Sequence, residues 1–242
     1  MDKYILVTGA SSGIGEATAR YLASCSYNLV LVARRKEKLE QLERELETEV
    51  LCVPFDLSNT EEIEDIFKTC KEQGIKLSGM VHCAGINRDM PIAVNDIGAM
   101  NEVTKINYYA FVELGKFFSK KKYSCDGSSI VAISSQAAVE RAKGMLTYAA
   151  SKAALNVTVG VMAKEFVRRK IRVNAILPNF VDTPMVRPKE SVLVGIDEKL
   201  EKQPLGIISP LEVAYLAEFL LSDKSEKITG AEIPISGGRL LE

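Results

Sequence analysis

The sequence predicts an α/β fold of the doubly wound kind, in which a parallel sheet carries helices on both faces. Short apolar runs rich in β-branched residues recur along the chain, and such runs are typical of buried strands. Stretches with helical periodicity separate them, and this alternation implies parallel strands joined by right-handed crossovers. The chain has 242 residues and is 47% apolar, which is enough to bury one large core. We therefore expect a single domain over residues 1–242.

The individual elements follow from local patterns. The apolar run YILV at residues 4–7 predicts the first strand, and the segment IGEATARYLAS predicts a helix that begins near Gly13. Residues 36–47 combine charged side chains with one apolar stripe, which predicts an amphipathic helix. The stripe consists of Leu39, Leu42 and Leu46. Further strands are predicted at residues 28–33, 50–55, 77–83, 129–134, 171–177 and 231–235.

A long irregular stretch runs from Pro178 to about Pro210. Loops of this length in a compact domain are usually functional. We expect the part from residue 184 to residue 210 to form most of a substrate pocket, although its sequence specifies no shape for that pocket.

The composition argues against several classes of partner and cofactor. Lysine and arginine total 31 against 32 aspartate and glutamate residues, so no basic field is available for nucleic acid or an anionic membrane. The five cysteines lie far apart without a C-x-x-C pair, which argues against disulfides and a zinc site. The first apolar run is too short for a signal peptide or a membrane span. We expect a cytoplasmic protein without a bound metal.

A glycine-rich segment, VTGASSGIGEA at residues 7–17, joins the first predicted strand to the first predicted helix. Glycines let the backbone turn sharply there and approach a ligand without a Cβ in the way. The N-terminus of the following helix offers free N–H groups and a positive dipole end, which suit a phosphate. The spacing is that of neither a P-loop nor a G-x-G-x-x-G motif, and a plain tight turn is the alternative. The candidate ligand-binding residues of this turn are Gly9, Ser11, Ser12, Gly13, Ile14 and Gly15.

Three polar residues in the second half of the chain form a candidate catalytic set. Tyr148 and Lys152 are separated by one helical turn in the predicted helix that contains TYAASKAAL, so both project from one face. A match of this spacing also arises by chance. Ser135 adds weight to it, because this residue follows the strand at 129–134, at the sheet edge where open α/β folds bind ligands. Ser134 is an adjacent competitor for the role of Ser135.

The string TGASSGIG at residues 8–15, together with the order and spacing of Ser135, Tyr148 and Lys152, resembles the short-chain dehydrogenase/reductase family. The resemblance covers nearly the whole chain. It implies a Rossmann-like fold, usually with a seven-stranded parallel sheet, that binds NAD or NADP. It also implies that Tyr148 donates a proton to the carbonyl oxygen being reduced, that Lys152 also binds the nicotinamide ribose, and that Ser135 hydrogen-bonds the substrate oxygen.

The chemistry of Tyr148 and Lys152 suits that reaction. A free phenol has a pKa of about 10, which is poorly matched to neutral pH. An ammonium group about 4 Å away contributes roughly 4 kcal/mol of attraction to the phenolate at an effective dielectric of about 20. That attraction corresponds to about three pKa units, so we expect Lys152 to bring the pKa of Tyr148 close to the working pH.

The second strand ends in Ala33, followed by Arg34 and Arg35, rather than in a carboxylate. A guanidinium pairs with a phosphate through charge-assisted hydrogen bonds, so Arg34 favours NADP as the cofactor. The alternative is that both arginines are surface charges at a helix start. Ser12 also opposes the NADP interpretation, because many NADP-using relatives have Lys or Arg at that position. The resemblance assigns further cofactor contacts to Asp56, Leu57, Ala84, Gly85, Pro178 and Thr183.

Three more residues are compared with the family pattern. Asn107 matches an asparagine that anchors a water-linked proton path from the lysine, and the alternative is a helix-interior asparagine bonded to nearby backbone. Relatives usually have two asparagines where this chain has His82 and Cys83, so the hydrogen bonds of those asparagines are in doubt. His82 is the only histidine, which leaves no histidine-based triad, and we expect it to be packed in a structural role.

The segment AGINRD at residues 84–89 resembles the corresponding segment of bacterial 3-oxoacyl-acyl-carrier-protein reductases of fatty acid biosynthesis. We therefore predict NADPH-dependent reduction of a 3-oxoacyl thioester, with acyl carrier protein as a candidate partner. In those enzymes two arginines meet the acidic carrier; Arg169 matches one position and Asp126 occupies the other. The alternatives are reaction with another alcohol or ketone, such as a sugar, polyol or small ketone, and a non-catalytic dinucleotide-binding regulatory protein.

Members of the family are commonly tetramers. We therefore expect a homotetramer assembled through two long helices, at about residues 100–122 and 147–169, and through the last strand. Three side chains either line such a face or pack within the subunit, and sequence does not separate the two. They are Phe117, Val157 and Val161.

Overall fold

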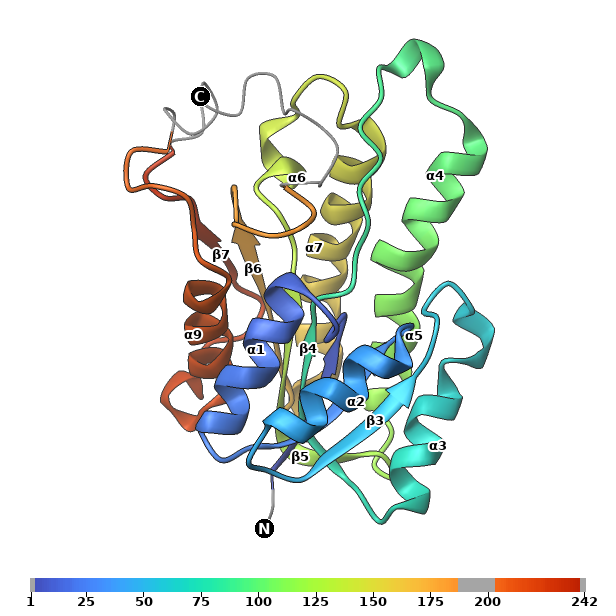
Figure 1. Cartoon of the computed structure of the whole chain (residues 1–242), viewed down its shortest axis with the longest axis vertical. Helices are drawn as coiled ribbons and strands as arrows, with labels where there is room; N and C mark the ends of the chain where they lie inside the picture. Colours follow the sequence, from blue (N-terminus) through green and yellow to red (C-terminus); the bar gives the residue numbers. More distant parts are fainter. Residues whose placement is uncertain (1–2, 187–202, 240–242) are drawn as a thin grey trace.

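The computed structural model describes residues 3–186 and 203–239. These residues form a seven-stranded parallel sheet in the order β3-β2-β1-β4-β5-β6-β7, which confirms the predicted fold class (Figure 1). The order reverses between β1 and β4, which is the position where folds of this kind bind ligands. The strands are β1 (Tyr4–Thr8), β2 (Asn28–Ala33), β3 (Val50–Pro54), β4 (Leu77–His82), β5 (Ser124–Ile133), β6 (Arg172–Pro178) and β7 (Glu232–Ile235).

Helices cover both faces of the sheet, and a separate cluster of buried apolar side chains lies under each layer. One cluster joins the sheet to α1 (Gly13–Ser24), α2 (Lys36–Glu45) and α9 (Pro210–Leu221). The other joins it to α3 (Glu64–Glu72), α5 (Ala110–Phe118) and α7 (Leu146–Phe166). Two shorter helices, α4 (Ile97–Thr104) and α6 (Ala137–Glu140), lie on the carboxyl side of the sheet. This layering brings the turns after β1 and β4 together at one edge.

Several predicted boundaries shift in the structure. The helix expected at about 100–122 is divided into α4 and α5 by a π-helical segment, Lys105–Tyr109. Strand β5 begins at Ser124 rather than at residue 129. Its first residues are polar, so the apolar pattern does not predict them, and the pairing with β4 shifts register between Leu77 and Gly79. The stretch after Pro178 is irregular where it is described, apart from one parallel bridge between Val181 and Ile208, and residues 187–202 of it lie outside the described residues.

The residues proposed for a subunit interface separate into two groups. Phe117 is 6% exposed and packs against Phe67 inside the chain, so it belongs to the core. Val157 and Val161 on α7 are 69% and 48% exposed. Two residues of the predicted apolar stripe, Leu39 and Leu42, are buried on α2, but the helix ends at Glu45, so half-buried Leu46 lies just beyond it.

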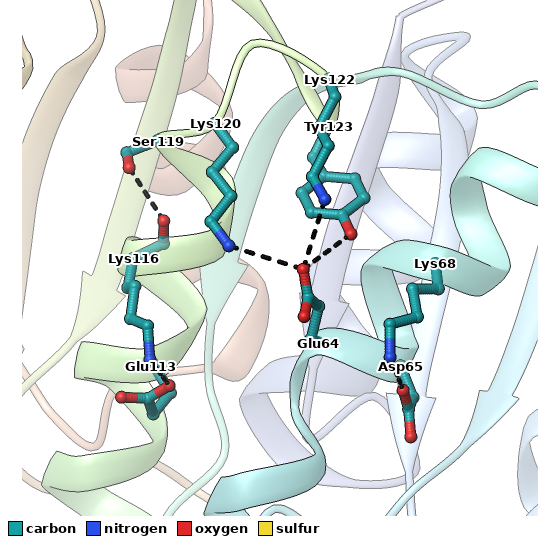
Figure 2. Close-up of polar contacts among 9 residues, drawn as sticks. All are labelled: Glu64, Asp65, Lys68, Glu113, Lys116, Ser119, Lys120, Lys122 and Tyr123. Atoms are coloured by element: carbon teal, nitrogen blue, oxygen red, sulfur yellow. Dashed lines mark hydrogen bonds and ion pairs between the residues drawn. The ribbon is translucent and has the colours of Figure 1, made fainter.

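Strand β5 is anchored at its amino end by polar contacts with α3 (Figure 2). Glu64 accepts a hydrogen bond from the Tyr123 hydroxyl at 3.0 Å and forms ion pairs with Lys120 at 3.5 Å and Lys122 at 3.4 Å. The Tyr123 hydrogen bond and the two ammonium groups lower the pKa of Glu64. These contacts fix the chain between α5 and β5, and hence the strand whose far end carries Ser135.

None of the helices in the described ranges is long and apolar enough to span a membrane.

Candidate active site

The glycine-rich turn after β1 requires glycine at particular positions. Gly9 has a φ of +67° and Gly13 a φ of +56°, a left-handed backbone that side chains disfavour. A Cβ on Gly9 would lie 2.9 Å from the Ala84 nitrogen, and one on Gly15 would lie 2.3 Å from the Gly9 carbonyl oxygen. The Ser12 side chain makes no capping bond to α1, so the first amides of this helix lack that partner. The turn therefore packs backbone against backbone and presents a helix N-terminus suited to an anion.

A cavity of about 250 Å³ lies beside this turn, at the carboxyl ends of β1, β2 and β4. Most of the predicted cofactor-binding residues line it: Gly9, Ser11, Ser12, Ile14, Gly15, Arg34, Asp56, Leu57, Ala84, Gly85 and Thr183. Apolar residues without any motif also line it, and sequence reasoning missed them: Phe55, Ile86, Ile106 and Met185. The predicted set is thus brought together from segments that are distant in the chain.

Four predicted cofactor contacts stand apart from the lining of this cavity: Tyr148 and Lys152, which belong to the catalytic set, and Gly13 and Pro178. A Cβ on Gly13 would lie 3.3 Å from Thr183 Cγ2, so Gly13 packs against the chain segment that follows β6. Pro178 ends β6, and its carbonyl oxygen accepts the Gln136 amide at 3.0 Å. Both residues therefore support the edge of the site from its neighbouring segments.

Two arginines border the cavity where β2 ends. Arg35 Nη2 donates to the Ser11 carbonyl oxygen at 3.0 Å and to Ser11 Oγ at 2.9 Å, which holds its guanidinium at the glycine-rich turn. Arg34 also lines the cavity, and the strand ends in Ala33 rather than in a carboxylate. Sequence reasoning selected Arg34 as the site residue, and the structure adds Arg35 as the one that contacts the turn.

The three predicted catalytic residues meet at the carboxyl end of β5 and the start of α7. Ser135 lies close enough to Tyr148 to lower the pKa of its phenol, and the Tyr148 side chain is partly exposed. Lys152 is buried, and its Nζ donates to the Ile133 carbonyl oxygen at 2.8 Å. A Cβ on Gly85 would lie 3.4 Å from Lys152 Nζ, so the ammonium group is next to the cavity lining. The amine of Lys152 therefore borders the cavity at Gly85, and the ring of Tyr148 lies 5.8 Å from it, measured to the ring centroid.

The expected acidification of Tyr148 by Lys152 is not found. Burial raises the pKa of Tyr148, and the hydrogen bond with Ser135 lowers it by less. Lys152 Nζ is directed to the Ile133 carbonyl oxygen and lies 5.8 Å from the Tyr148 ring centroid, and its charge does not lower the pKa of Tyr148. Burial lowers the pKa of Lys152 itself to about 8. Tyr148 is therefore a protonated phenol at neutral pH, the form that donates a proton.

The structure distinguishes Ser135 from its neighbour Ser134. Ser134 is buried, and its hydroxyl donates to Asn156 Oδ1 at 2.5 Å. Asn156 in turn donates to Glu232 Oε2 at 2.7 Å, which links β5, α7 and β7. Ser135 faces Tyr148 instead. The adjacent hydroxyls thus have different environments, and only that of Ser135 is combined with the phenol.

Asn107 lies in the π-helical segment and is fully buried. Its Oδ1 accepts the Ile86 amide at 2.8 Å, and its Nδ2 donates to the Ile86 carbonyl oxygen at 2.9 Å and to Ser151 Oγ at 3.0 Å. The Ser151 hydroxyl donates to the Tyr148 carbonyl oxygen at 2.7 Å. Asn107 is therefore bonded to the backbone of a segment distant in the sequence rather than to its own helix, and it ties the segment after β4 to α7. Sequence reasoning missed Ser151, whose signal is its position directly before Lys152.

The two residues that replace the usual asparagines differ in their surroundings. His82 is fully buried, and its Nδ1 lies 3.0 Å from Thr8 Oγ1. Burial, together with the charge of Lys152, lowers the pKa of His82 to about 3. Cys83 lines the cavity, and burial raises the pKa of its thiol to about 12. Both side chains are therefore neutral at physiological pH.

The predicted carrier contact at Arg169 needs correction. Arg169 donates to Asp126 Oδ1 at 2.8 Å, to the Ser119 carbonyl oxygen at 2.7 Å and to the Ser124 carbonyl oxygen at 2.8 Å. Its side chain is only 14% exposed. The two positions that the resemblance assigned to carrier recognition form an ion pair with each other, so Arg169 is occupied within its own chain.

Over residues 3–186 and 203–239, no cluster of three or more His, Cys, Asp or Glu side chains could hold a metal ion.

The parallel sheet, the glycine-rich turn and the adjoining cavity define a dinucleotide-binding oxidoreductase. Residues 9–239 match the family model described as enoyl-(acyl carrier protein) reductase. The chain belongs to the short-chain dehydrogenase/reductase family.

Individual relatives differ in the substrates that their names give. The chain is 31% identical over 240 residues to the 3-oxoacyl-[acyl-carrier-protein] reductase of Homo sapiens, covering 98% of each chain. It is also 31% identical to the L-xylulose reductase of Caenorhabditis elegans, covering 98% of this chain and 95% of the relative. A solved structure of 4-hydroxyisoleucine dehydrogenase complexed with NADH has a TM-score of 0.91, 26% identity and full coverage of both chains.

The residues at the cavity fit a nicotinamide dinucleotide. Glycine leaves room at the turn, because a Cβ on Gly15 would meet the Gly9 carbonyl oxygen and one on Gly9 would meet the backbone at Ala84. The N-terminus of α1 and the guanidinium groups of Arg34 and Arg35 suit phosphates at one end. At the other end, apolar residues line the cavity, and Gly85 lies between the cavity and Lys152 Nζ.

Proposed function

We propose that the protein is an NADPH-dependent reductase that converts a carbonyl to an alcohol, with a 3-oxoacyl thioester as its leading substrate. The observation that carries the proposal is the grouping of Ser135 and Tyr148 with buried Lys152, whose Nζ lies next to Gly85 in the lining of a dinucleotide cavity. A non-catalytic regulatory protein would have no need for this set of groups. The similarity to 3-oxoacyl-[acyl-carrier-protein] reductases over the whole chain supports the thioester.

Tyr148 is the proton donor in this mechanism. The bound nicotinamide would supply the hydride to the carbonyl carbon. Ser135 donates a hydrogen bond to the carbonyl oxygen of the substrate and stabilises the negative charge that develops on it. Tyr148 transfers its hydroxyl proton to that oxygen, and its raised pKa keeps the proton in place until the charge appears.

Lys152 and Asn107 act around that transfer. Lys152, with a pKa of about 8, carries a positive charge at neutral pH that favours the phenolate left behind. Lys152 would also bind the nicotinamide ribose, since its Nζ is adjacent to Gly85 in the cavity lining. Asn107 holds the Ile86 backbone and Ser151, which keeps the two sides of the site in register. We assign it a positioning role.

NADP as the cofactor rests on the two arginines. Arg34 and Arg35 flank the end of β2, where a 2′-phosphate would meet guanidinium groups instead of a carboxylate. Arg35 is already held at Ser11 by two hydrogen bonds, so little conformational entropy is lost when it binds a phosphate. Asp56 and Leu57 line the same end and are proposed for the adenine ring.

A second candidate is reduction of a sugar, polyol or small ketone. It is favoured by the equal identity to an L-xylulose reductase and by the internal pairing of Arg169 with Asp126, which removes one basic contact for an acidic carrier. Acyl carrier protein therefore stays a candidate partner only as part of the thioester hypothesis.

The assembly and the cellular setting are further parts of the proposal. Val157 and Val161 on the exposed face of α7 support a homotetramer. All five cysteines are free thiols, which supports a reducing cytoplasm. We treat residues 1–242 as a single dinucleotide-binding and catalytic domain.

The proposed function is tested by following NADPH and NADH oxidation with acetoacetyl-CoA and with a panel of sugars, polyols and ketones. We expect turnover with NADPH and the thioester. Turnover confined to sugars or ketones would favour the second candidate. Cofactor binding with no turnover of any carbonyl compound would overturn the enzymatic hypothesis in favour of a regulatory protein.

A further inference from the structure

His82 joins the two central strands of the sheet through a single hydroxyl group. Parallel pairing places Thr8, the last residue of β1, opposite His82, the last residue of β4. His82 Nδ1 lies 3.0 Å from Thr8 Oγ1, and the Ala84 amide donates to the same oxygen at 3.2 Å. The imidazole ring also packs against Phe111 of α5, with 5.3 Å between the ring centroids. The hydroxyl of Thr8 is thus shared between a side chain and the backbone that borders the cavity.

The balance of donors and acceptors selects one tautomer of His82. A threonine hydroxyl has one proton and accepts through its oxygen. Since the Ala84 amide already donates to Thr8 Oγ1, the hydroxyl proton is available for His82 Nδ1. Among the described residues, the buried Nε2 atom has no hydrogen-bond partner in either tautomer. With the proton on Nε2, the hydrogen bonds at Thr8 are all formed and only this Nε2–H group lacks a partner. With the proton on Nδ1, the Thr8 oxygen would accept hydrogen bonds from both Nδ1–H and the Ala84 amide. The Thr8 hydroxyl proton would then lose His82 Nδ1 as its acceptor.

The contact with Thr8 fixes the chain segment after β4, which lies beside Lys152 in the folded chain. Ala84 and Gly85 follow His82 directly and line the cavity. The segment is held at its start by the Ala84–Thr8 hydrogen bond and further along by the Ile86 amide on Asn107. A Cβ on Gly85 would lie 3.4 Å from Lys152 Nζ, so a small displacement of this segment moves it against the ammonium group.

We propose that His82 is a positioning residue for the nicotinamide end of the site, because its Nε2–H tautomer orients the Thr8 hydroxyl and thereby holds Ala84 and Gly85 beside Lys152. The expected effect on NADPH binding rests on the proposed function, but the tautomer follows from the hydrogen bonds within the protein. Full burial and the nearby Lys152 charge keep the imidazole neutral.

The tautomer is tested by nitrogen-15 NMR of the imidazole, which needs no assignment because His82 is the only histidine of the chain. We expect one neutral species protonated at Nε2, with shifts that stay constant from about pH 5 to pH 9. The Thr8→Val variant should move the Nδ1 resonance, since Nδ1 then loses its donor. A proton on Nδ1, or titration near pH 6.5, would overturn the inference.

The positioning role is tested with two matched variants. Asparagine carries an acceptor oxygen at the δ position, where histidine has Nδ1, so His82→Asn retains an acceptor for Thr8. His82→Leu has a methyl group there and removes it. We expect His82→Leu to raise the dissociation constant for NADPH about tenfold, the loss expected for one hydrogen bond. His82→Asn should remain within about twofold of the wild type, a difference of less than 0.5 kcal/mol by the same conversion.

Adenosine 2′,5′-bisphosphate separates positioning from general damage. This fragment contains the adenine end of NADPH without the nicotinamide, so its dissociation constant should be unchanged in both variants. A parallel loss of both ligands in His82→Leu, or no loss of NADPH binding, would overturn the positioning role. Failure of the wild-type protein to bind either compound would instead refute the proposed NADPH specificity, while the NMR result would still decide the tautomer.

Discussion

Replacement of Arg169 by methionine tests whether this residue supports the fold or meets a carrier protein. Methionine retains much of the apolar stem and removes the guanidinium. In the native chain the group donates to two backbone carbonyls, those of Ser119 and Ser124, and to Ser124 Oγ and Asp126. Its side chain is 14% exposed, so these acceptors are poorly compensated by solvent when it is removed.

The magnitude follows from the two carbonyl oxygens. A buried acceptor that loses its partner costs about 1–3 kcal/mol, so we expect Arg169→Met to lower the free energy of unfolding by about 3 kcal/mol. For a chain of this size that corresponds to a fall in Tm of about 6–12 °C. Arg168→Met is the matched control, because Arg168 is exposed and its replacement should leave Tm nearly unchanged.

The functional half of the test compares two thioesters of the same acyl group, acetoacetyl-CoA and acetoacetyl-acyl carrier protein. Ser124 begins β5 and Ser135 follows its other end, which puts Arg169 and Tyr148 at opposite ends of a strand. Because β4 pairs with β5 from Leu77 opposite Ser124 to His82 opposite Ala132, at about 3.3 Å per residue of β4 Arg169 and Tyr148 lie on the order of 20 Å apart within one chain. We expect the ratio of the two KM values to stay constant in Arg169→Met. A stable variant with a selective rise in KM for the carrier-bound substrate would refute this reasoning.

Three further predictions concern the cofactor turn, cofactor choice and pH dependence. Gly15→Ala should weaken NADPH binding by more than about tenfold, measured by fluorescence titration, because its Cβ would lie 2.3 Å from the Gly9 carbonyl oxygen; unchanged binding would contradict the packing of the turn. Replacing Arg34 and Arg35 together by alanine should lower the ratio of kcat/KM for NADPH to that for NADH at least about tenfold; an unchanged ratio would exclude them from phosphate recognition. The rate of reduction should fall as pH rises above about 8, because the Lys152 amine is charged below that pKa and neutral above it; a rate that stays constant to about pH 10 would show that this charge is not needed.

The sequence predicts the parts of the fold that depend on local pattern. Buried strands show as continuous apolar runs, and the turn after β1 shows as glycines at positions where the backbone permits nothing larger. Gly9 illustrates this, since its positive φ and its contact with Ala84 both exclude a side chain. Ser135 and Tyr148 were predicted from their order and spacing with Lys152, which are features of the sequence alone.

The remaining features depend on contacts between distant segments, and local pattern carries no signal for them. Nothing in the sequence around Lys152 indicates that its ammonium donates to the Ile133 carbonyl and that its charge does not lower the pKa of Tyr148. The pairing of Arg169 with Asp126 likewise joins residues from two elements that meet only in the folded chain. Asn107 in the π-helical segment is another case, because the hydrogen bonds of its side chain go to Ile86 and Ser151 rather than to its own helix.

The most direct test of the central claim is the reductase rate of Tyr148→Phe at neutral pH, measured beside its affinity for NADPH. The variant removes one oxygen atom from the ring and leaves the cavity lining intact. We expect the rate to fall by about 10²–10⁴, the contribution typical of a positioned proton donor, with NADPH affinity within about twofold of the wild type. A variant that reduces the thioester at the wild-type rate would contradict the assignment of Tyr148 as the proton donor.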